Sequence, residues 1–132
     1  MKWNYLFLFF STIVLIQACQ RDPYREGALL YKMQCANCHG DEGQGLGELI
    51  PPLAKSDYLT PHRAELPCLL VKGQNDTIIV NGKKYFDQAM PANPALSDVH
   101  VANILNYIQN NWENEQPDFT LDEVKKAIAP CR

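Results

Sequence analysis

Cys35-Ala36-Asn37-Cys38-His39 is the stretch that decides the fold, because it places two thiols and an imidazole close together along the chain. Thiols at this spacing lie on one turn and can form thioethers with the two vinyl groups of a porphyrin, while the adjacent imidazole ligates the iron. A chance C-x-x-C, a redox dithiol and half of a zinc site are the other interpretations. The stretch therefore predicts one covalently bound haem c, held by Cys35, Cys38 and His39.

Composition limits the size of the protein and its partners. The chain has 132 residues, of which 46% are hydrophobic and 20% charged, so it can form one compact domain with a modest core. Its formal net charge is −3, and an acidic surface of this kind gives no support to nucleic-acid binding. We therefore expect no nucleic-acid partner.

Residues 1–18 have the pattern of a bacterial lipoprotein signal peptide. An apolar run from Tyr5 to Ile16 follows the single charge of Lys2, and it is short for a membrane span, which takes about 20 residues. The segment ends in Leu15-Ile16-Gln17-Ala18-Cys19, which resembles a lipobox, although Ile16 stands where leucine is commoner. An ordinary signal peptide cut nearby and an uncleaved anchor are the alternatives.

We expect Cys19 to be lipidated, because several acyl chains on one residue would anchor the protein stably. Residues 19–23 would then be a short tether, and residues 24–132 would form the folded domain. The expected location is the periplasmic side of the cell envelope, on a bacterial membrane.

Two of the five cysteines have no part in the lipid or haem assignments, namely Cys68 and Cys131. An exported compartment permits them to pair. A disulfide between them would tie the C-terminal helix to the middle of the chain, and two free buried thiols are the alternative.

The sequence predicts an all-α domain with a small inserted hairpin. A first helix is expected from near Pro23 to Met33, with Gly27 at a close helix crossing. A short helix is expected to open at Thr60-Pro61, to be broken or kinked by Pro67 and to end at Gly73.

The remaining elements follow from turn and capping signals. Asn81-Gly82 between two apolar runs predicts a β-hairpin over about residues 77–86. Ser97 is the expected cap of a helix that continues to about Asn111. Thr120 and Glu123 form a capping box for an extra C-terminal helix, which Pro130 stops.

The second axial ligand of the iron is predicted to be Met90. Met1 leaves with the signal peptide, and Met33 lies too near Cys35 in the sequence to reach across the ring. A methionine is more often core filler, and His62 and His100 are the rival ligands. On the other face, the rigid Pro51-Pro52 stretch can place a backbone carbonyl against the second nitrogen of His39.

With these residues in place, the sequence resembles the class I c-type cytochromes over about residues 24–112. The matches are Gly27 and Tyr31 before the C-x-x-C-H run, then Pro51, the pair Met90-Pro91, and Tyr107. The resemblance implies the cytochrome c fold, with His39 and Met90 as axial ligands and the Pro51 carbonyl receiving the proton of His39. It also implies that the first and last major helices cross at Gly27 and Tyr107. The hairpin and the tail from Thr120 to Arg132 depart from the pattern.

The expected function is electron transfer by a membrane-anchored monohaem cytochrome between respiratory-chain redox partners, with no enzyme activity. Both axial positions are filled, so no small-molecule substrate is expected. The alternative is a haem c subunit of a larger oxidase or reductase complex. An enzyme or gas sensor with an open sixth position and a zinc module are the remaining hypotheses.

Overall fold

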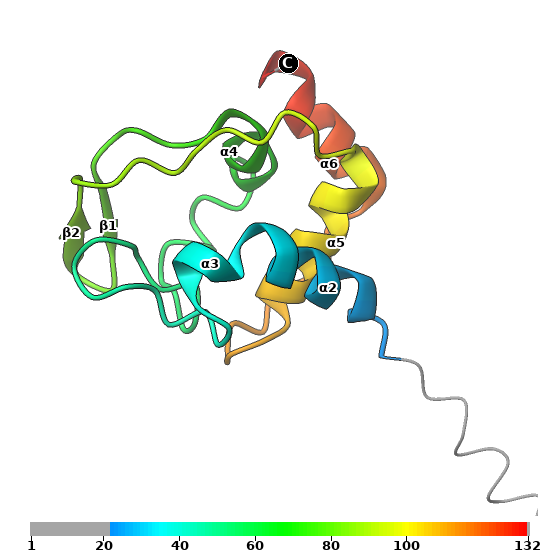
Figure 1. Ribbon diagram of the computed structural model, residues 1–132. Coiled ribbons are helices and arrows are strands. Elements are labelled where there is room, and N and C mark those ends of the chain that lie inside the picture. Colours follow the sequence, from blue (N-terminus) through cyan, green and yellow to red (C-terminus); the bar gives the residue numbers. More distant parts are fainter. Residues whose placement is uncertain (1–21, 132) are drawn as a thin grey trace, which may run out of the picture.

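The computed structural model describes residues 22–131, which form a helical domain with one small antiparallel sheet (Figure 1). The predicted signal peptide, Cys19 and most of the tether lie outside the described residues. No helix within residues 22–131 is long and apolar enough to cross a membrane. In chain order the elements are α2 (Arg25–Gln34), α3 (Ala36–His39), α4 (Leu66–Lys72), β1 (Ile78–Val80), β2 (Lys83–Tyr85), α5 (Asp98–Gln109), α6 (Leu121–Ile128) and a 3-10 helix, η1 (Ala129–Cys131).

The crossing of α2 over α5 is the main helix contact of the fold (Figure 1). A methyl group on Gly27 would lie 2.7 Å from the Cβ of Tyr107 and 2.9 Å from the carbonyl carbon of Asn103. Only glycine allows the two backbones to approach this closely, so the predicted crossing of Gly27 and Tyr107 is confirmed. α2 begins slightly later than predicted, after a turn in which Arg25 donates its N–H to the carbonyl of Asp22.

The prediction of a helix that opens at Thr60 is wrong. Residues 58–65 form successive turns, and α4 begins only at Leu66, with Pro67 in its first turn. Proline has no N–H to donate, which costs nothing at the start of a helix, so Pro67 starts α4 rather than breaking it. Gly73 ends the helix as predicted, with φ +80°.

The predicted β-hairpin is confirmed. β1 and β2 pair in antiparallel register, with Ile78 opposite Tyr85 and Val80 opposite Lys83. Tyr85 is buried, and the turn is tied to the body of the domain because Asn81 and Asp57 exchange backbone-to-side-chain hydrogen bonds of 2.6 and 3.0 Å. The hairpin therefore packs against the domain. An isolated two-stranded hairpin would be only marginally stable, so it needs these contacts.

The late helices begin where their caps predict. The side chain of Ser97 accepts the N–H of His100 at the start of α5, and Thr120 and Glu123 form the capping box of α6. The two helices bury their apolar faces in one core that also receives α4 and the Phe119 side chain. The core thus packs against Cys35 and Ala36 and extends to Val124 and Ile128 of α6.

Candidate functional site

The cysteines of the C-x-x-C-H stretch lie at the junction of α2 and α3. Cys35 ends α2 and begins α3, and its N–H donates to the carbonyl of Tyr31 over 2.8 Å. Cys35 is half-buried, Cys38 is exposed, and both are free thiols. The short helix α3 then places His39 one turn beyond Cys35, with a hydrogen bond from the His39 N–H to the Cys35 carbonyl of 2.9 Å.

The electrostatics of Cys35 separate the interpretations of this pair. Burial, with a smaller contribution from the neighbouring Cys38, raises the pKa of the Cys35 thiol to about 11. A redox dithiol works through a thiolate whose pKa is lowered, so the environment of Cys35 is the opposite of what that chemistry needs. Two free thiols at this spacing remain suited to thioether formation.

His39 is oriented by the chain that follows it. Its Nδ1 lies 3.1 Å from the carbonyl oxygen of Pro51, so the protonated Nδ1 donates to this oxygen and Nε2 keeps its lone pair. Burial lowers the pKa of His39, against a smaller rise caused by the Pro51 carbonyl. The imidazole is therefore held neutral, which is the form that ligates a metal.

Pro51 is in turn held through Leu53, two residues further along the chain. The N–H of Leu53 donates to the carbonyl of Gly43 over 2.7 Å, and the side chain of Asn114 donates to the carbonyl of Leu53 over 2.9 Å. Asn114 is buried and also bonds the carbonyl of Ile108 and the N–H of Ser56. The Pro51 carbonyl is thus fixed with respect to the end of α5.

An aromatic cluster supports the segment around α3. The rings of Tyr31, Tyr107 and Trp112 lie within 5.0 to 5.4 Å of one another, and the Tyr31 hydroxyl donates to the carbonyl of Gly40 over 2.6 Å. Burial raises the pKa of Tyr31, so this hydroxyl stays protonated as a donor. The bond fixes the residue that follows His39.

Met90 lies on the segment that joins β2 to α5. In Figure 1 this segment is separate from α3. Its backbone exchanges two hydrogen bonds with Gln74, of 3.0 and 2.9 Å. The residue is half-buried and packs against the core, as Leu53 does on the histidine side. The Cys35–His39 stretch and Met90 therefore come from two segments that are far apart in the sequence.

Of the two rival ligands, the side chain of His62 has other partners and that of His100 is exposed. His62 stacks on Tyr58 with 3.9 Å between ring centroids, and its Nδ1 lies 3.3 Å from a carboxylate oxygen of Glu65. His100 is exposed in the first turn of α5. Within residues 22–131, no group of three or more His, Cys, Asp or Glu side chains is placed to hold a metal ion.

The donor set suits haem c. Two free thiols, one neutral imidazole with a free Nε2 and one thioether are the groups that attach and ligate this cofactor. Cys35 and Met90 are themselves half-buried and, like Leu53, pack against the core. The residues present therefore fit haem c.

A family model for cytochrome c matches residues 24–112, from the turn before α2 to Trp112 of the aromatic cluster. The chain belongs to the cytochrome c family. The match to this cytochrome c includes the hairpin and ends before the segment that carries α6.

Two curated relatives extend the match along most of the chain. A cytochrome c-552 of Thermus thermophilus is 34% identical to this cytochrome c over 132 residues, covering 93% of this chain and 83% of the relative. A second cytochrome c-552 of the same species is 36% identical over 113 residues, covering 79% of this chain and 85% of the relative. The protein is thus a class I c-type cytochrome that binds haem c covalently, transfers electrons and is not an enzyme.

A third relative is part of a complex. The cytochrome c subunit of the quinone alcohol dehydrogenase of Gluconacetobacter polyoxogenes is 28% identical over 103 residues, covering 69% of this chain but 19% of the relative. This cytochrome c therefore corresponds to a small part of that subunit.

The structure brings together His39 and Pro51 as expected and joins Cys68 to Cys131 in a disulfide, with Cα atoms 5.8 Å apart. Sequence reasoning missed Asn114 and Trp112, which fix the histidine side. The one signal in the sequence was Trp112 itself, a large aromatic residue among the polar residues 109–116.

Proposed function

We propose that this cytochrome c is a membrane-tethered carrier of single electrons, in which Cys35 and Cys38 attach the haem and His39 and Met90 are its axial ligands. The haem supplies an iron that cycles between Fe(II) and Fe(III). With both axial positions filled by the chain, no site is left for a substrate, and the protein acts between redox partners. Methionine opposite histidine raises the reduction potential.

The observation that carries this proposal is the contact of His39 Nδ1 with the Pro51 carbonyl, 3.1 Å away. It selects the tautomer in which Nε2 can ligate, and it holds the plane of the ring. The Pro51 carbonyl is fixed through Leu53 by Asn114 and Gly43. A ligand held by this network keeps its geometry in both oxidation states, which is what rapid electron transfer requires.

Substitution of each candidate ligand tests the axial assignment. Met90→Ala in the matured protein should remove the ferric absorption band of methionine ligation and lower the reduction potential. His62→Gln and His100→Gln are the matched controls and should leave both unchanged. Loss of the band in His62→Gln or His100→Gln, or carbon monoxide binding by the native ferrous protein, would contradict the assignment.

We further propose that the carrier is anchored by lipid on Cys19 at the periplasmic face of the cell envelope. Support comes from the lipobox pattern at residues 15–19 and from the short distance in sequence to α2. Labelling of the expressed protein with a radioactive fatty acid should mark wild type and not Cys19→Ser, which should also leave the membrane fraction. A labelled Cys19→Ser protein would refute the lipid site.

A second candidate function is that of a haem c subunit in a larger oxidase or reductase complex. It is favoured by the similarity to the cytochrome c subunit of a quinone alcohol dehydrogenase. Mild detergent extraction separates the two functions, because a subunit would migrate with its complex in native gels and a free carrier would migrate alone.

A further inference from the structure

The backbone of Met90 is bonded to the end of α4. Gln74, directly after this helix, exchanges hydrogen bonds of 3.0 and 2.9 Å with Met90, and the N–H of Asn93 donates to the carbonyl of Val71 over 3.0 Å. Gly73 has φ +80°, and a methyl group there would lie 2.8 Å from the nitrogen of Ala92. We call residues 90–93 the methionine strap, and the end of α4 sets its position.

α4 is held in place by the C-terminal segment, residues 117–131. Cys68 in the middle of α4 is bonded to Cys131 in η1. α6 packs beside α4, so that the two lie together at one end of the molecule (Figure 1). The disulfide therefore restrains the helix to which the strap is bonded.

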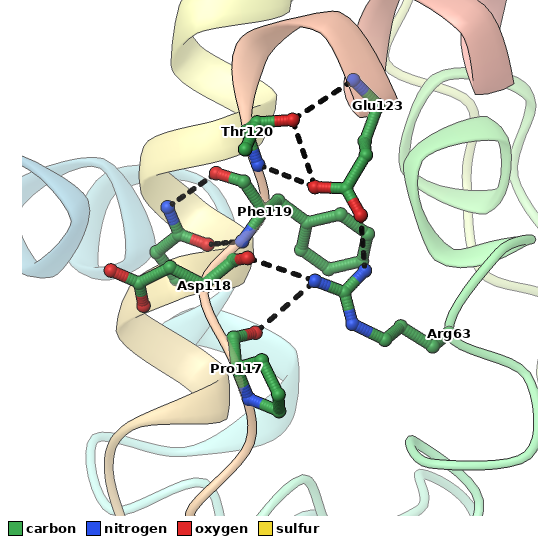
Figure 2. A network of polar contacts seen from close by, with 7 residues as sticks. Arg63, Pro117, Asp118, Phe119, Thr120 and Glu123 are labelled. Atoms are coloured by element: carbon green, nitrogen blue, oxygen red, sulfur yellow. Dashed lines mark hydrogen bonds and ion pairs between the residues drawn. The ribbon is translucent and has the colours of Figure 1, made fainter.

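Arg63 makes a second connection, just before α4 in the sequence. Figure 2 shows its guanidinium group donating to the carbonyls of Pro117 and Asp118, over 3.2 and 2.9 Å. It lies 3.6 Å from a carboxylate oxygen of Glu123 and 3.7 Å from the ring centroid of Phe119. These bonds join the residues around the first turn of α6 to the segment that leads into α4.

From these contacts we infer that residues 117–131 form a brace that positions Met90 at the iron through α4. Cys131 in this brace and its contacts Cys68 and Arg63 act as positioning residues, because none of them is a ligand. The brace lies beyond residue 112, where the match to the family model ends. This inference rests on the proposed ligation by Met90.

The physical consequence concerns opening of the strap. An external ligand can reach the iron on the methionine side only when Met90 has moved away, so its binding reports how often the strap opens. If the brace is lost, α4 and the strap gain freedom and the open state becomes more populated. A loss of stability elsewhere in the fold should not change this local opening.

Imidazole binding to the ferric holoprotein tests the inference. Cys68→Ser/Cys131→Ser should bind imidazole about tenfold more tightly than wild type, and Arg63→Lys, which keeps the disulfide and the charge, should show a smaller increase. Gly27→Ala is the control, because it destabilises the crossing of α2 and α5 and not the strap, and it should bind as wild type does.

Hydrogen exchange at the backbone amides of Gln74 and Met90 gives a second readout. Both amides should exchange faster than in wild type in Cys68→Ser/Cys131→Ser and in Arg63→Lys, the two brace variants, but not in Gly27→Ala. Wild-type imidazole affinity in both brace variants would overturn the inference, and so would an equal increase in Gly27→Ala. Failure of the proposed function is a different result, since wild type itself would then lack the ferric band of methionine ligation.

Discussion

The side-chain amide of Asn114 donates to the carbonyl of Leu53 over 2.9 Å, across 61 residues of sequence. The same side chain bonds the carbonyl of Ile108 over 2.8 Å and the N–H of Ser56 over 3.2 Å. One buried residue therefore joins the end of α5 to the segment that orients His39.

Asn114→Ala should lower the free energy of unfolding by about 2 kcal/mol, because it leaves a buried N–H and two carbonyls without their partner. Denaturant titration followed by circular dichroism measures the loss. Asn111→Ala, which removes one bond to the carbonyl of Tyr107, is the control and should cost less than about 1 kcal/mol. Equal losses in the two variants would show that Asn114 has no special role.

Gly27→Ala should destabilise the protein by about 1 to 3 kcal/mol, although alanine is the better helix former. The added methyl group would lie 2.7 Å from the Cβ of Tyr107, so α2 and α5 must separate. Glu26→Ala, at the exposed neighbouring position of α2, is the control and should be close to neutral. A thermal midpoint for Gly27→Ala at or above that of wild type would contradict the close crossing.

Glu123 should make the stability of the protein depend on acidity. Its hydrogen bonds with the Thr120 backbone and side chain, and the nearby charge of Arg63, lower the pKa of Glu123 in the folded state. A lowered folded pKa means that its stabilisation is complete above the ordinary glutamate pKa and is lost as the pH falls through the folded value.

The free energy of unfolding, measured from neutral to acid pH, should therefore fall less steeply for Glu123→Gln than for wild type. The difference should lie between the ordinary glutamate pKa and the lowered pKa of Glu123 in the folded state. Glu115→Gln makes the same change of charge at an exposed position and should keep the wild-type slope. If the free energy of unfolding fell equally with pH in all three proteins, Glu123 would not contribute to the acid dependence of stability.

Gln109 is fully buried on α5, and among the described residues neither of its amide atoms has a hydrogen-bond partner. Gln109→Met keeps the length of the side chain and removes the unpaired polar atoms, so it should raise the free energy of unfolding by about 1 kcal/mol. Gln116→Met is the control, because Gln116 donates to the carbonyl of Asn114 over 3.0 Å, and it should not stabilise. A destabilised Gln109→Met would reveal that the amide has a partner.

Local signals in the sequence predicted much of the fold. Asn81-Gly82 predicted the hairpin, Ser97 and Thr120 predicted the starts of α5 and α6, and Gly27 with Tyr107 predicted the crossing. Each of these signals acts within a few residues or belongs to a known family pattern. Pro67 was misread because proline both ends helices and begins them, and only the turns at residues 58–65 decide between the two.

The Pro51 carbonyl and the Cys68–Cys131 disulfide were expected from the sequence, but the other long-range contacts around the site could not be predicted in the same way. Arg63 meets Asp118 across 55 residues, and Asn114 meets Leu53 across 61. A polar residue in a loop gives no local sign of a distant partner, because its role depends on how the helices pack. Cys35, Cys38 and His39 were predicted from their spacing and Met90 by elimination, whereas Asn114 and Arg63 had to be found in three dimensions.

The central claim is that Met90 is the axial ligand opposite His39, and proton NMR of the ferrous holoprotein tests it most directly. The methyl group of an axial methionine lies over the macrocycle, whose ring current shifts its signal far upfield of every other methyl group. One such signal should be present in wild type and absent in Met90→Ala, while Met33→Ala should retain it. A wild-type spectrum without this signal, or its persistence in Met90→Ala, would contradict the claim.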